Sequence, residues 1–453
     1  MAPVETIVAP ATPVGTSALA LVRIDGPEAA AWVTSALGRS APPEARRPTL
    51  GVWRNRAGNP VDQVVATLWA QGSSATGNAG AEICCHGNPR IVRMLVEDCL
   101  ARGARMAEPG EFTRRAFVNG RIDLTQAEAV ADLIHADSER ALEAARRQLG
   151  GELGRAVAGW TDRSLAVLAE LEAHIDFPEE DLPPEAPGGP RRRLLELAAE
   201  LEAAASTERH AAALRSGVRL AVVGAPNAGK SSLLNALCGK ERALVSPEAG
   251  TTRDFLEAEV TGWPLRVTAV DTAGLRQGGD TLEKAGMERS LDQAEGADFI
   301  LCVVDRSAPP PELPKRLMDL LKPGRAAVVA NKSDLPPHPA LPGFLPALPR
   351  VECHLLSPAG AEAARAALAG LLKQADLTPA DDNLLVGARH AAAMRAASVA
   401  LRMAARHLEK GGAETELAAT QVRGGLDSLG EIVGRVDNER MLDKLFASFC
   451  IGK

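Results

Sequence analysis

Tyrosine is absent from this 453-residue sequence, and aromatic residues make up only 3% of it. No apolar run approaches the roughly 18 residues that a membrane-spanning helix needs, so we expect no membrane association. The hydrophobic content of 46% is ordinary for a soluble globular protein, and much of it is alanine, which favours helices. At about 100–200 residues per domain, the chain should contain two to four domains.

Cysteine is also scarce, with 7 residues scattered along the chain, an odd number that argues against a disulfide framework. Cys84, Cys85 and His86 lie together but lack the paired spacing of a zinc site. The last cysteine, Cys450, lies four residues from the end, in FCIGK. That spacing resembles a prenylation signal, yet lysine is not a usual final residue, and no polybasic run precedes it. The thiol is therefore either a small buried hydrophobe or a functional group.

Positive charge is in deficit. The net charge of −7 gives no overall attraction to nucleic acid. Local basic patches could still form from the arginines at positions 114, 115, 121 and 191–193. The first cationic residue is Arg23, so we expect no targeting segment and a cytoplasmic location.

Residues 1 to about 120 alternate short β-like runs with turns, which predicts an α+β domain. The pattern predicts strands at 6–10, 17–24, 62–70 and 81–87, and a helix at 90–104. From about Asp123 the periodicity becomes helical, with one predicted stripe at Leu165, Leu168, Leu171 and Ile175. That helix should end at the Pro/Gly/acid segment 176–190, and another should follow at 191–206.

Between about residues 217 and 377 the pattern becomes strand, loop and helix in repetition. Near-continuous β-branched runs at 218–224, 265–271, 297–305 and 325–331 predict a parallel sheet covered on both faces. Helical character then returns to the end, where Leu442, Leu445, Phe446 and Phe449 share one face. The sequence therefore predicts a helical domain interrupted by an inserted α/β domain.

The segment GAPNAGKS, at 224–231, matches the phosphate-binding pattern G-x-x-x-x-G-K-[ST] between a predicted strand and a predicted helix. Its glycines let main-chain N–H groups surround phosphate oxygens at a helix N-terminus. Lys230 would reach the β- and γ-phosphates, and Ser231 would offer a hydroxyl to Mg²⁺.

Three further motifs follow in the order found in GTPases. Asp271 in DTAG ends a strand, where a carboxylate can orient magnesium, and AGTTRD lies in a loop that could close over the γ-phosphate. In NKSD, Asn331 can read the purine edge, and Asp334 can accept both N–H donors of guanine, which adenine lacks. This constellation resembles the translation-factor-like GTPases. Leu275 stands where Ras-type enzymes place a water-orienting glutamine, so the catalytic polar group must come from elsewhere.

Over nearly its full length the sequence resembles the MnmE (TrmE) family of bacterial tRNA uridine-34 modification GTPases. The resemblance rests on TIVAPATP, VRIDGP, PGEFTRRAFVNGRIDLTQAEAVADLI, IDFPEED, GAPNAGKSSLLNAL, AGTTRD, DTAGLR and the terminal FCIGK. It implies an N-terminal α+β tetrahydrofolate-binding and dimerisation domain at 1–121 and an all-α helical domain at 122–214 and 378–453. An α/β Ras-like P-loop G domain would be inserted at 215–377.

For the G domain, the resemblance implies GTP hydrolysis in a dimer, with K⁺ in the place of an arginine finger and Glu283 orienting water through a second water. The implied K⁺ ligands are Asn227, Ser246, Glu248 and Thr251, and the implied Mg²⁺ ligands are Ser231 and Thr252. The implied nucleotide contacts are Asn227, Ala228, Gly229, Lys230, Ser231, Ser232, Ser246, Pro247, Glu248, Ala249, Gly250, Thr251, Thr252, Asp271, Thr272, Ala273, Gly274, Asn331, Lys332, Ser333, Asp334, Ser357, Pro358 and Ala359.

For the N-terminal domain, the resemblance implies a constitutive homodimer that binds 5-formyl-tetrahydrofolate or another C1-tetrahydrofolate. The matching positions are Arg23, Glu82, Arg121 and Lys453, and Cys450 would lie beside the folate as a catalytic thiol. The implied partner is the FAD-dependent flavoprotein MnmG, in a heterotetramer. Together they would attach a carboxymethylaminomethyl-type group to C5 of the wobble uridine of tRNA.

The sequence departs from the family pattern at four places. PVGTSA (13–18) replaces a Gly/Arg-rich turn, Arg121 stands where lysine is common, Ser246 replaces a threonine, and SPAG (357–360) differs from the usual guanine-base loop. A ribosome-assembly GTPase of the Era-like type would share the G motifs, but it needs an RNA-binding module and gives no role to Cys450. A helical scaffold with a vestigial site would not need intact Lys230, Asp271, Asn331 and Asp334.

Overall fold

The computed structural model describes residues 5–176, 189–238, 257–260, 263, 266–271, 291–375, 384–410, 414–434, 439–447, 449 and 452. The chain divides into two compact units, each built from separated stretches. The first holds residues 1–131, 148–165 and 426–453, and the second holds 132–147 and 166–425. Four helices run from one unit into the other: α4 (Leu124–His135), α5 (Glu139–Leu149), α6 (Glu152–Asp176) and α14 (Thr415–Val433).

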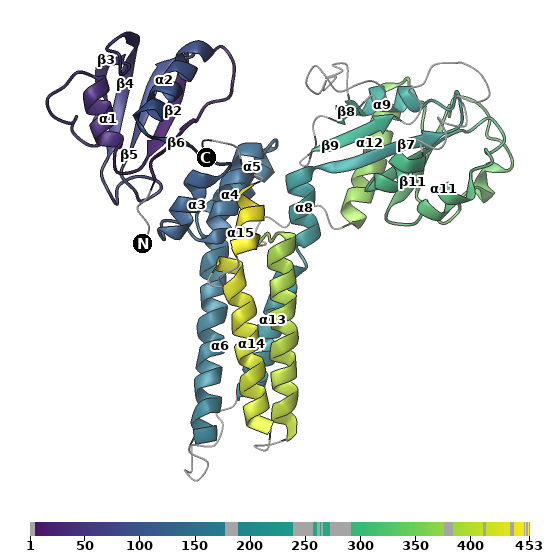
Figure 1. Ribbon diagram of the computed structural model, residues 1–453. Coiled ribbons are helices and arrows are strands. Elements are labelled where there is room, and N and C mark those ends of the chain that lie inside the picture. The colour runs from purple at the N-terminus through teal and green to yellow at the C-terminus, as the bar shows by residue number, and fades with distance from the viewer. Residues whose placement is uncertain are drawn as a thin grey trace. The chain divides into compact units, whose positions relative to one another are not determined.

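The first unit begins with a six-stranded sheet in the order β3-β4-β5-β2-β1-β6, antiparallel except for the parallel pair β1 and β6. Its strands are β1 (Ile7–Pro10), β2 (Leu19–Asp25), β3 (Thr49–Arg54), β4 (Pro60–Trp69), β5 (Gly80–His86) and β6 (Arg105–Met106). Helices α1 (Ala29–Ala36) and α2 (Pro89–Arg102) cover one face of this sheet (Figure 1). The predicted strands and the predicted helix at 90–104 are confirmed, whereas α1 and β3 were not predicted.

Helix α2 shows how local sequence sets an element. The Asn88 side chain accepts a hydrogen bond from the Arg90 N–H at its start, and Pro89 occupies the first turn. Gly103 ends it in the left-handed region, at φ 112°. Behind it, alternate residues of β5 such as Ala81 and Ile83 point into the core, so the intervening residues face the other way.

Past the sheet, the first unit contains α3 (Glu111–Val118), the start of α4, and α15 (Glu439–Phe446). Leu442, Phe446 and Phe449 are buried against Leu124 and Ala127 of α4, and Leu445 packs at the edge of the same cluster. The predicted apolar face of the last helix is therefore confirmed, and residues more than 300 positions apart in the sequence share one core.

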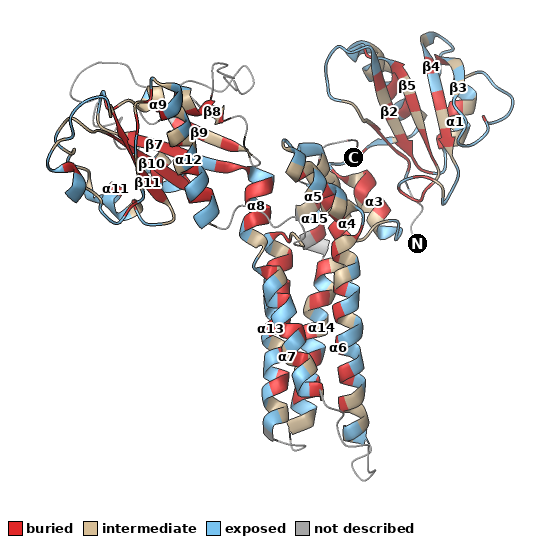
Figure 2. Cartoon of the chain, turned by 180° about the vertical axis from the view of Figure 1, so that it is seen from behind, coloured by how far each residue is buried: buried red, intermediate tan, exposed pale blue. Residues whose placement is uncertain are grey.

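The second unit contains a helical bundle in which α7 (Pro190–Ala205) and α13 (Ala388–His407) lie side by side with parts of α6 and α14 (Figures 1 and 2). Buried residues line the facing sides of these helices, as Figure 2 shows. The predicted stripe on α6 is confirmed for Leu168 and Leu171 but wrong for Leu165, which is 47% exposed. Val167 is buried beside Leu168 instead, because the stripe drifts round the helix with the 3.6-residue period.

The second unit also contains a six-stranded sheet in the order β12-β11-β10-β7-β9-β8, parallel except for the antiparallel edge strand β8. Its strands are β7 (Val218–Gly224), β8 (Glu257–Val260), β9 (Val267–Asp271), β10 (Phe299–Asp305), β11 (Ala326–Asn331) and β12 (Arg350–Glu352). Its helices are α8 (Glu208–Ser216), which leads into β7, then α9 (Lys230–Cys238), α11 (Lys315–Leu320) and α12 (Pro358–Gln374).

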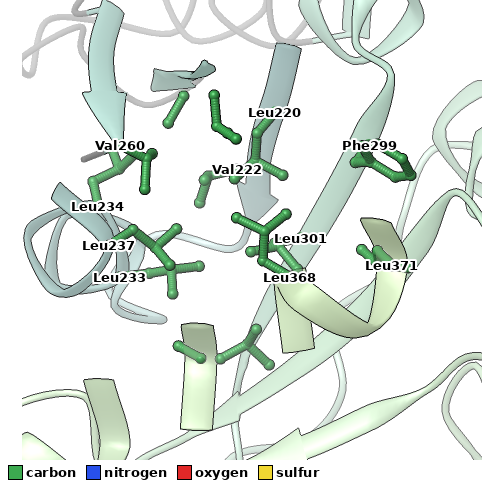
Figure 3. Close-up of a cluster of buried hydrophobic side chains, with 14 of the residues drawn as sticks. Leu220, Val222, Leu233, Leu234, Leu237, Val260, Phe299, Leu301, Leu368 and Leu371 are labelled. Atoms are coloured by element: carbon green, nitrogen blue, oxygen red, sulfur yellow. The ribbon is translucent and has the colours of Figure 1, made fainter. Parts of the chain in front are cut away.

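Both faces of this sheet are covered, as the continuous apolar strands predict. On one face, leucines of α9 and α12 such as Leu233, Leu237 and Leu368 pack on Val222 and Leu301 (Figure 3). On the other face, α11 packs on a second cluster. The remaining short 3₁₀ helices are η1 (Leu341–Gly343) and η2 (Leu408–Lys410). No helix within the described residues is both long and apolar enough to cross a membrane.

Candidate functional site

The predicted nucleotide residues gather at the carboxyl ends of the parallel strands. Asp271 ends β9 opposite Val222 of β7, and β7 itself ends at Gly224. On the other side of β7, β10 ends at Asp305, directly opposite Asn331, the last residue of β11. In open α/β sheets, ligands bind beyond these carboxyl ends, at the strand where connections leave in opposite directions. Here that strand is β7, and the loop that follows it is the predicted phosphate-binding loop.

The phosphate-binding loop, residues 225–229, joins β7 to α9 and approaches its neighbours closely. A Cβ atom at Gly224 would lie 2.2 Å from the Val303 carbonyl oxygen, and one at Gly229 would lie 2.1 Å from the Asn331 amide nitrogen. Gly229 has φ 105°, and Asn227 has φ 62°, a left-handed conformation that asparagine tolerates. Glycine is therefore required at positions 224 and 229.

Lys230 begins α9 and folds back over the loop, where its ammonium donates to the carbonyls of Gly224 and Ala225 at 2.8 Å each. Ser231 is exposed and Ser232 half-buried in the first turn of the helix, while Ala228 is buried at 2% exposure. The N-terminal N–H groups of α9 and the Lys230 cation form a site for an anion such as a nucleotide phosphate.

The Asn331 side chain forms hydrogen bonds with two neighbouring loops. Its amide nitrogen donates to the Ala228 carbonyl at 3.0 Å, and its amide oxygen accepts from the Leu355 N–H at 3.1 Å. The residue is only 6% exposed. This side chain therefore holds the phosphate-binding loop, the NKSD loop (residues 331–335) and the loop before α12 in one arrangement. The contact of Asn331 with the purine edge of the base remains a prediction.

The NKSD loop carries a second charged contact. Lys332, at φ 64°, donates to the Asp305 carboxylate at 2.6 Å, and Asp305 also accepts from the N–H and hydroxyl of Ser307. Burial by itself would raise the pKa of Asp305, but the bonds from Lys332 and Ser307 outweigh it and hold that pKa below its usual value. Asp334 is exposed at the tip, where a base could reach it.

The SPAG segment forms the start of α12. Ser357 is the N-cap: its hydroxyl oxygen accepts from the Gly360 N–H at 3.1 Å and also donates to the His354 carbonyl. The Ser357 N–H donates to the same carbonyl at 2.9 Å. Ser357 thus caps α12, and Pro358 and Ala359 form its first turn; the contact of these residues with guanine remains a prediction.

Part of the predicted site lies outside the described residues. The predicted residues that lie outside are three of the four implied K⁺ ligands with the rest of their loop, the residues after Asp271, the catalytic Glu283, and the terminal Cys450 and Lys453. By number, the loop residues are Ser246, Pro247, Glu248, Ala249, Gly250, Thr251 and Thr252, and those after Asp271 are Thr272, Ala273 and Gly274. The main chain of Asp271 ends β9, which is where the sequence predicts it. Among the described residues, no group of three or more His, Cys, Asp or Glu side chains could hold a metal ion.

Two of the predicted folate residues, Arg23 and Glu82, lie on the face of the first unit's sheet away from α1 and α2, here called the open face. Phe112 of α3 covers the β1 side of this face. Arg23 and Glu82 are direct cross-strand neighbours, and both Nε and Nη2 of Arg23 donate to one Glu82 oxygen, at 3.1 and 2.9 Å. Nη1 of Arg23 donates to the main-chain oxygen of Gly452 at 3.3 Å. Arg121 lies against Gly77, where an added Cβ would meet its side chain at 3.2 Å. The structure therefore brings Arg23, Glu82 and Gly452 together.

The same open face carries an apolar row. Leu50, Val65, Cys84 and Leu21 are successive cross-strand neighbours on β3, β4, β5 and β2, and Leu50 is 64% exposed. Val65 is also exposed, and Cys84 is half-buried. Two residues along the strands on the same face, Arg23, Glu82 and Thr67 form the next row of cross-strand neighbours. An exposed apolar row beside a charged pair is typical of an interaction surface.

Sequence reasoning missed Asp305 and Gly452. A signal existed for Asp305, because a carboxylate directly after a buried parallel strand lies at the same edge as the other site residues. Gly452 has φ 92°, and an added Cβ would lie 2.1 Å from the Pro10 carbonyl oxygen. No local pattern could predict that contact, since the two residues are at opposite ends of the chain.

Comparisons with known proteins cover the whole chain. The model of the MnmE helical domain matches residues 124–450, and the model of the GTP-binding protein TrmE N-terminus matches residues 6–121. The tRNA modification GTPase MnmE of Opitutus terrae is 46% identical over 462 residues, covering 100% of both chains. The proteins of the same name from Phenylobacterium zucineum and Akkermansia muciniphila are 40% and 38% identical, each over 99% or more of both chains. The chain therefore belongs to the MnmE (TrmE) family.

Proposed function

We propose that the chain hydrolyses GTP and, with a flavoprotein partner of the MnmG type, modifies C5 of uridine 34 in tRNA. The names of the full-length relatives support both GTP hydrolysis and action on tRNA. The observation that carries the proposal is the contact of Arg23 with both Glu82 and Gly452. It brings the C-terminal segment to the sheet face where a C1-folate would bind. We propose domains at 1–121, 122–214, 215–377 and 378–453.

The described residues of the phosphate-binding loop support binding of a nucleotide phosphate. Two glycines leave room that a Cβ would fill, and Lys230 and the N-terminus of α9 supply positive charge. We propose that Ser231 and Thr252 ligate Mg²⁺, which would neutralise phosphate charge when bound. Lys230 would exchange its two carbonyl partners for phosphate oxygens, and Asp334 would accept the two guanine donors.

We further propose that K⁺ stimulates hydrolysis, with Asn227, Ser246, Glu248 and Thr251 as its ligands, across a dimer of G domains. The left-handed Asn227 at the exposed rim of the phosphate-binding loop supports this position. GTP turnover should rise when K⁺ replaces Na⁺, and Asn227→Ala should remove the response while sparing nucleotide affinity. Equal rates in both salts would contradict the K⁺ site. Glu283→Ala should lower kcat with little change in affinity, because the residue would act in the transition state.

The folate proposal rests on the chemistry of the face-borne side chains. The Glu82 carboxylate can accept from the N–H donors of a pterin ring, and the Arg23 and Arg121 cations can bind the carboxylates of a glutamate tail. We propose that Lys453 adds a further cation and that Cys450 supplies a thiol beside the C1 unit. The exposed apolar row on the same face supports a homodimer formed through this domain.

Mass analysis of wobble-uridine nucleosides tests the whole proposal. Cells that lack the protein should lose the modified nucleoside, and the parent chain should restore it. Cys450→Ser should fail to restore it while GTP hydrolysis and folding persist, whereas Cys353→Ser, a buried thiol of the G domain, should restore it. If the nucleosides are normal in cells without the protein, the Era-like ribosome-assembly function would take its place.

A further inference from the structure

Arg306 directly follows β10, next to Asp305, at the same edge as the nucleotide residues. Its main chain is part of the edge: its N–H donates to the Asn331 carbonyl at 2.9 Å, and its carbonyl accepts from the His338 N–H at 2.8 Å. The side chain is 19% exposed and turns towards the NKSD loop. None of the sequence motifs includes this residue.

The Arg306 guanidinium clamps the loop on both sides of Asp334. Its Nη1 donates to the Ser333 carbonyl at 3.1 Å and to the Leu335 carbonyl at 2.9 Å. These are the residues immediately before and after Asp334. A single planar cation thus fixes the two peptide groups that set where the Asp334 carboxylate points.

Asn331 and Lys332 anchor the first half of this loop through the contacts described above, but fewer contacts hold residues 333–335. The other main-chain bonds of these three residues run from the Ser333 N–H to the Cys353 carbonyl at 3.2 Å and from the Leu335 N–H to the Lys332 carbonyl at 3.0 Å. Asp334 is exposed, and Leu335 is 43% exposed, so apolar burial contributes little at the tip. The guanidinium clamp is therefore a major restraint on the segment.

Glu352 forms an ion pair with the Arg306 guanidinium. It ends β12, and its carboxylate lies 2.9 Å from Nε of Arg306. The contact is an ion pair rather than a directed hydrogen bond, because the buried Nε finds no aligned acceptor. Glu352 is 47% exposed, so solvent screens much of its attraction. The carbonyl bonds, more than the ion pair, set the loop geometry.

We propose that Arg306 is a positioning residue for guanine selectivity, acting through the NKSD loop on the carboxylate of Asp334. The inference rests on the proposed function, in which Asp334 accepts the two N–H donors of guanine. The Asp334 carboxylate can accept from both guanine N–H donors at once only if it is held in one orientation. In a mobile loop it would form only one well-aligned hydrogen bond at a time. Loss of Arg306 should therefore weaken guanine recognition without changing the phosphate site.

The test compares GDP with IDP, which lacks the exocyclic amino group, on the full chain. The parent should prefer GDP, and Arg306→Ala should reduce the ratio of the two affinities about tenfold. Arg306→Lys keeps the charge but not the planar fork, so its ratio should fall less. A variant that merely destabilised the fold would lower both affinities in proportion and leave the ratio unchanged.

Arg325→Ala is the matched control. Arg325 precedes β11 at the opposite edge and donates to the carbonyls of Ala294, Glu295 and Ala297 in the same manner. Its GDP to IDP ratio should equal that of the parent. A parent that prefers GDP together with an unchanged ratio in both Arg306 variants would overturn the positioning role alone. A parent that binds ADP as well as GDP would instead overturn the guanine assignment on which it rests.

Discussion

Arg23 and Glu82 lie on neighbouring antiparallel strands, whereas Asn331 and Asp334 lie in the NKSD loop, which begins at the last residue of a parallel strand. The first pair needs only strand register to bring it together, because cross-strand neighbours on one face are in reach of each other. The second set lies in loops, so buried polar contacts such as those of Asn331 must hold it. A site on a sheet face should therefore tolerate change around it, while a site on loops should be sensitive to residues that never touch the ligand.

Asp334→Asn should produce the largest effect, because it changes the base-reading group itself. The amide would meet guanine N–H donors with its own donor, so GDP affinity should fall about 100-fold or more. Xanthosine diphosphate, which offers a carbonyl at that position, should bind in its place. Equilibrium binding of both nucleotides measures the exchange, and GDP binding as tight as in the parent would refute the base-reading role.

Gly229→Ala should produce the second largest loss of GDP affinity, although glycine has no side chain that could contact the nucleotide. The new Cβ would lie 2.1 Å from the amide of Asn331, at a φ of 105°. Strain of about 1.4–2.7 kcal/mol should weaken GDP binding roughly tenfold to 100-fold.

Gly370→Ala is the control for this change, since Gly370 lies in α12 with open space where its Cβ would be. It should leave binding unchanged and should raise the melting temperature slightly, because alanine favours helix. If both variants bind GDP like the parent, the close packing of the phosphate-binding loop does not matter for affinity.

Glu82→Gln should act more locally. It removes an ion pair whose partners are 26% and 29% exposed, so the free energy of unfolding should change by about 1 kcal/mol at most. Binding of 5-formyl-tetrahydrofolate, measured by calorimetry, should weaken about tenfold as a charge-assisted bond is lost. Glu44→Gln removes the exposed pair with Arg47 in the same unit and should change neither quantity. Equal folate affinity in the parent and in Glu82→Gln would show that Glu82 does not contribute to folate binding.

The smallest expected effect is a difference in alkylation rate between Cys84 and Cys85, which are adjacent and lie on opposite faces of β5. Burial, with smaller contributions from Asp62 and Cys84, raises the pKa of Cys85 to about 11. At pH 8 this thiol is protonated and should resist iodoacetamide, and its reactivity should rise about tenfold per pH unit up to that pKa. Cys84 is half-buried on the open face and should react first in peptide mapping. Faster labelling of Cys85 would mean that the two faces are assigned the wrong way round.

The comparison also explains what the sequence could predict. The phosphate-binding loop, the strand ends and the apolar face of α15 follow from local patterns, and the structure confirms their positions. The link from Asn331 to Leu355 could not be predicted, because it depends on how two loops meet in space. Helix α1 and strand β3 were missed as well, since a short alanine-rich helix and a strand with a glycine at position 51 have weak periodicity.

Gly452 also determines when this protein can finish folding during its synthesis. It lies against Pro10, and Phe446 and Phe449 pack on the start of α4, so the first unit needs residues from both ends of the chain. All of the second unit, residues 132–147 and 166–425, is translated before residue 452. The N-terminal sheet therefore lacks its contact with Gly452 until that residue has been synthesised, after the whole of the second unit.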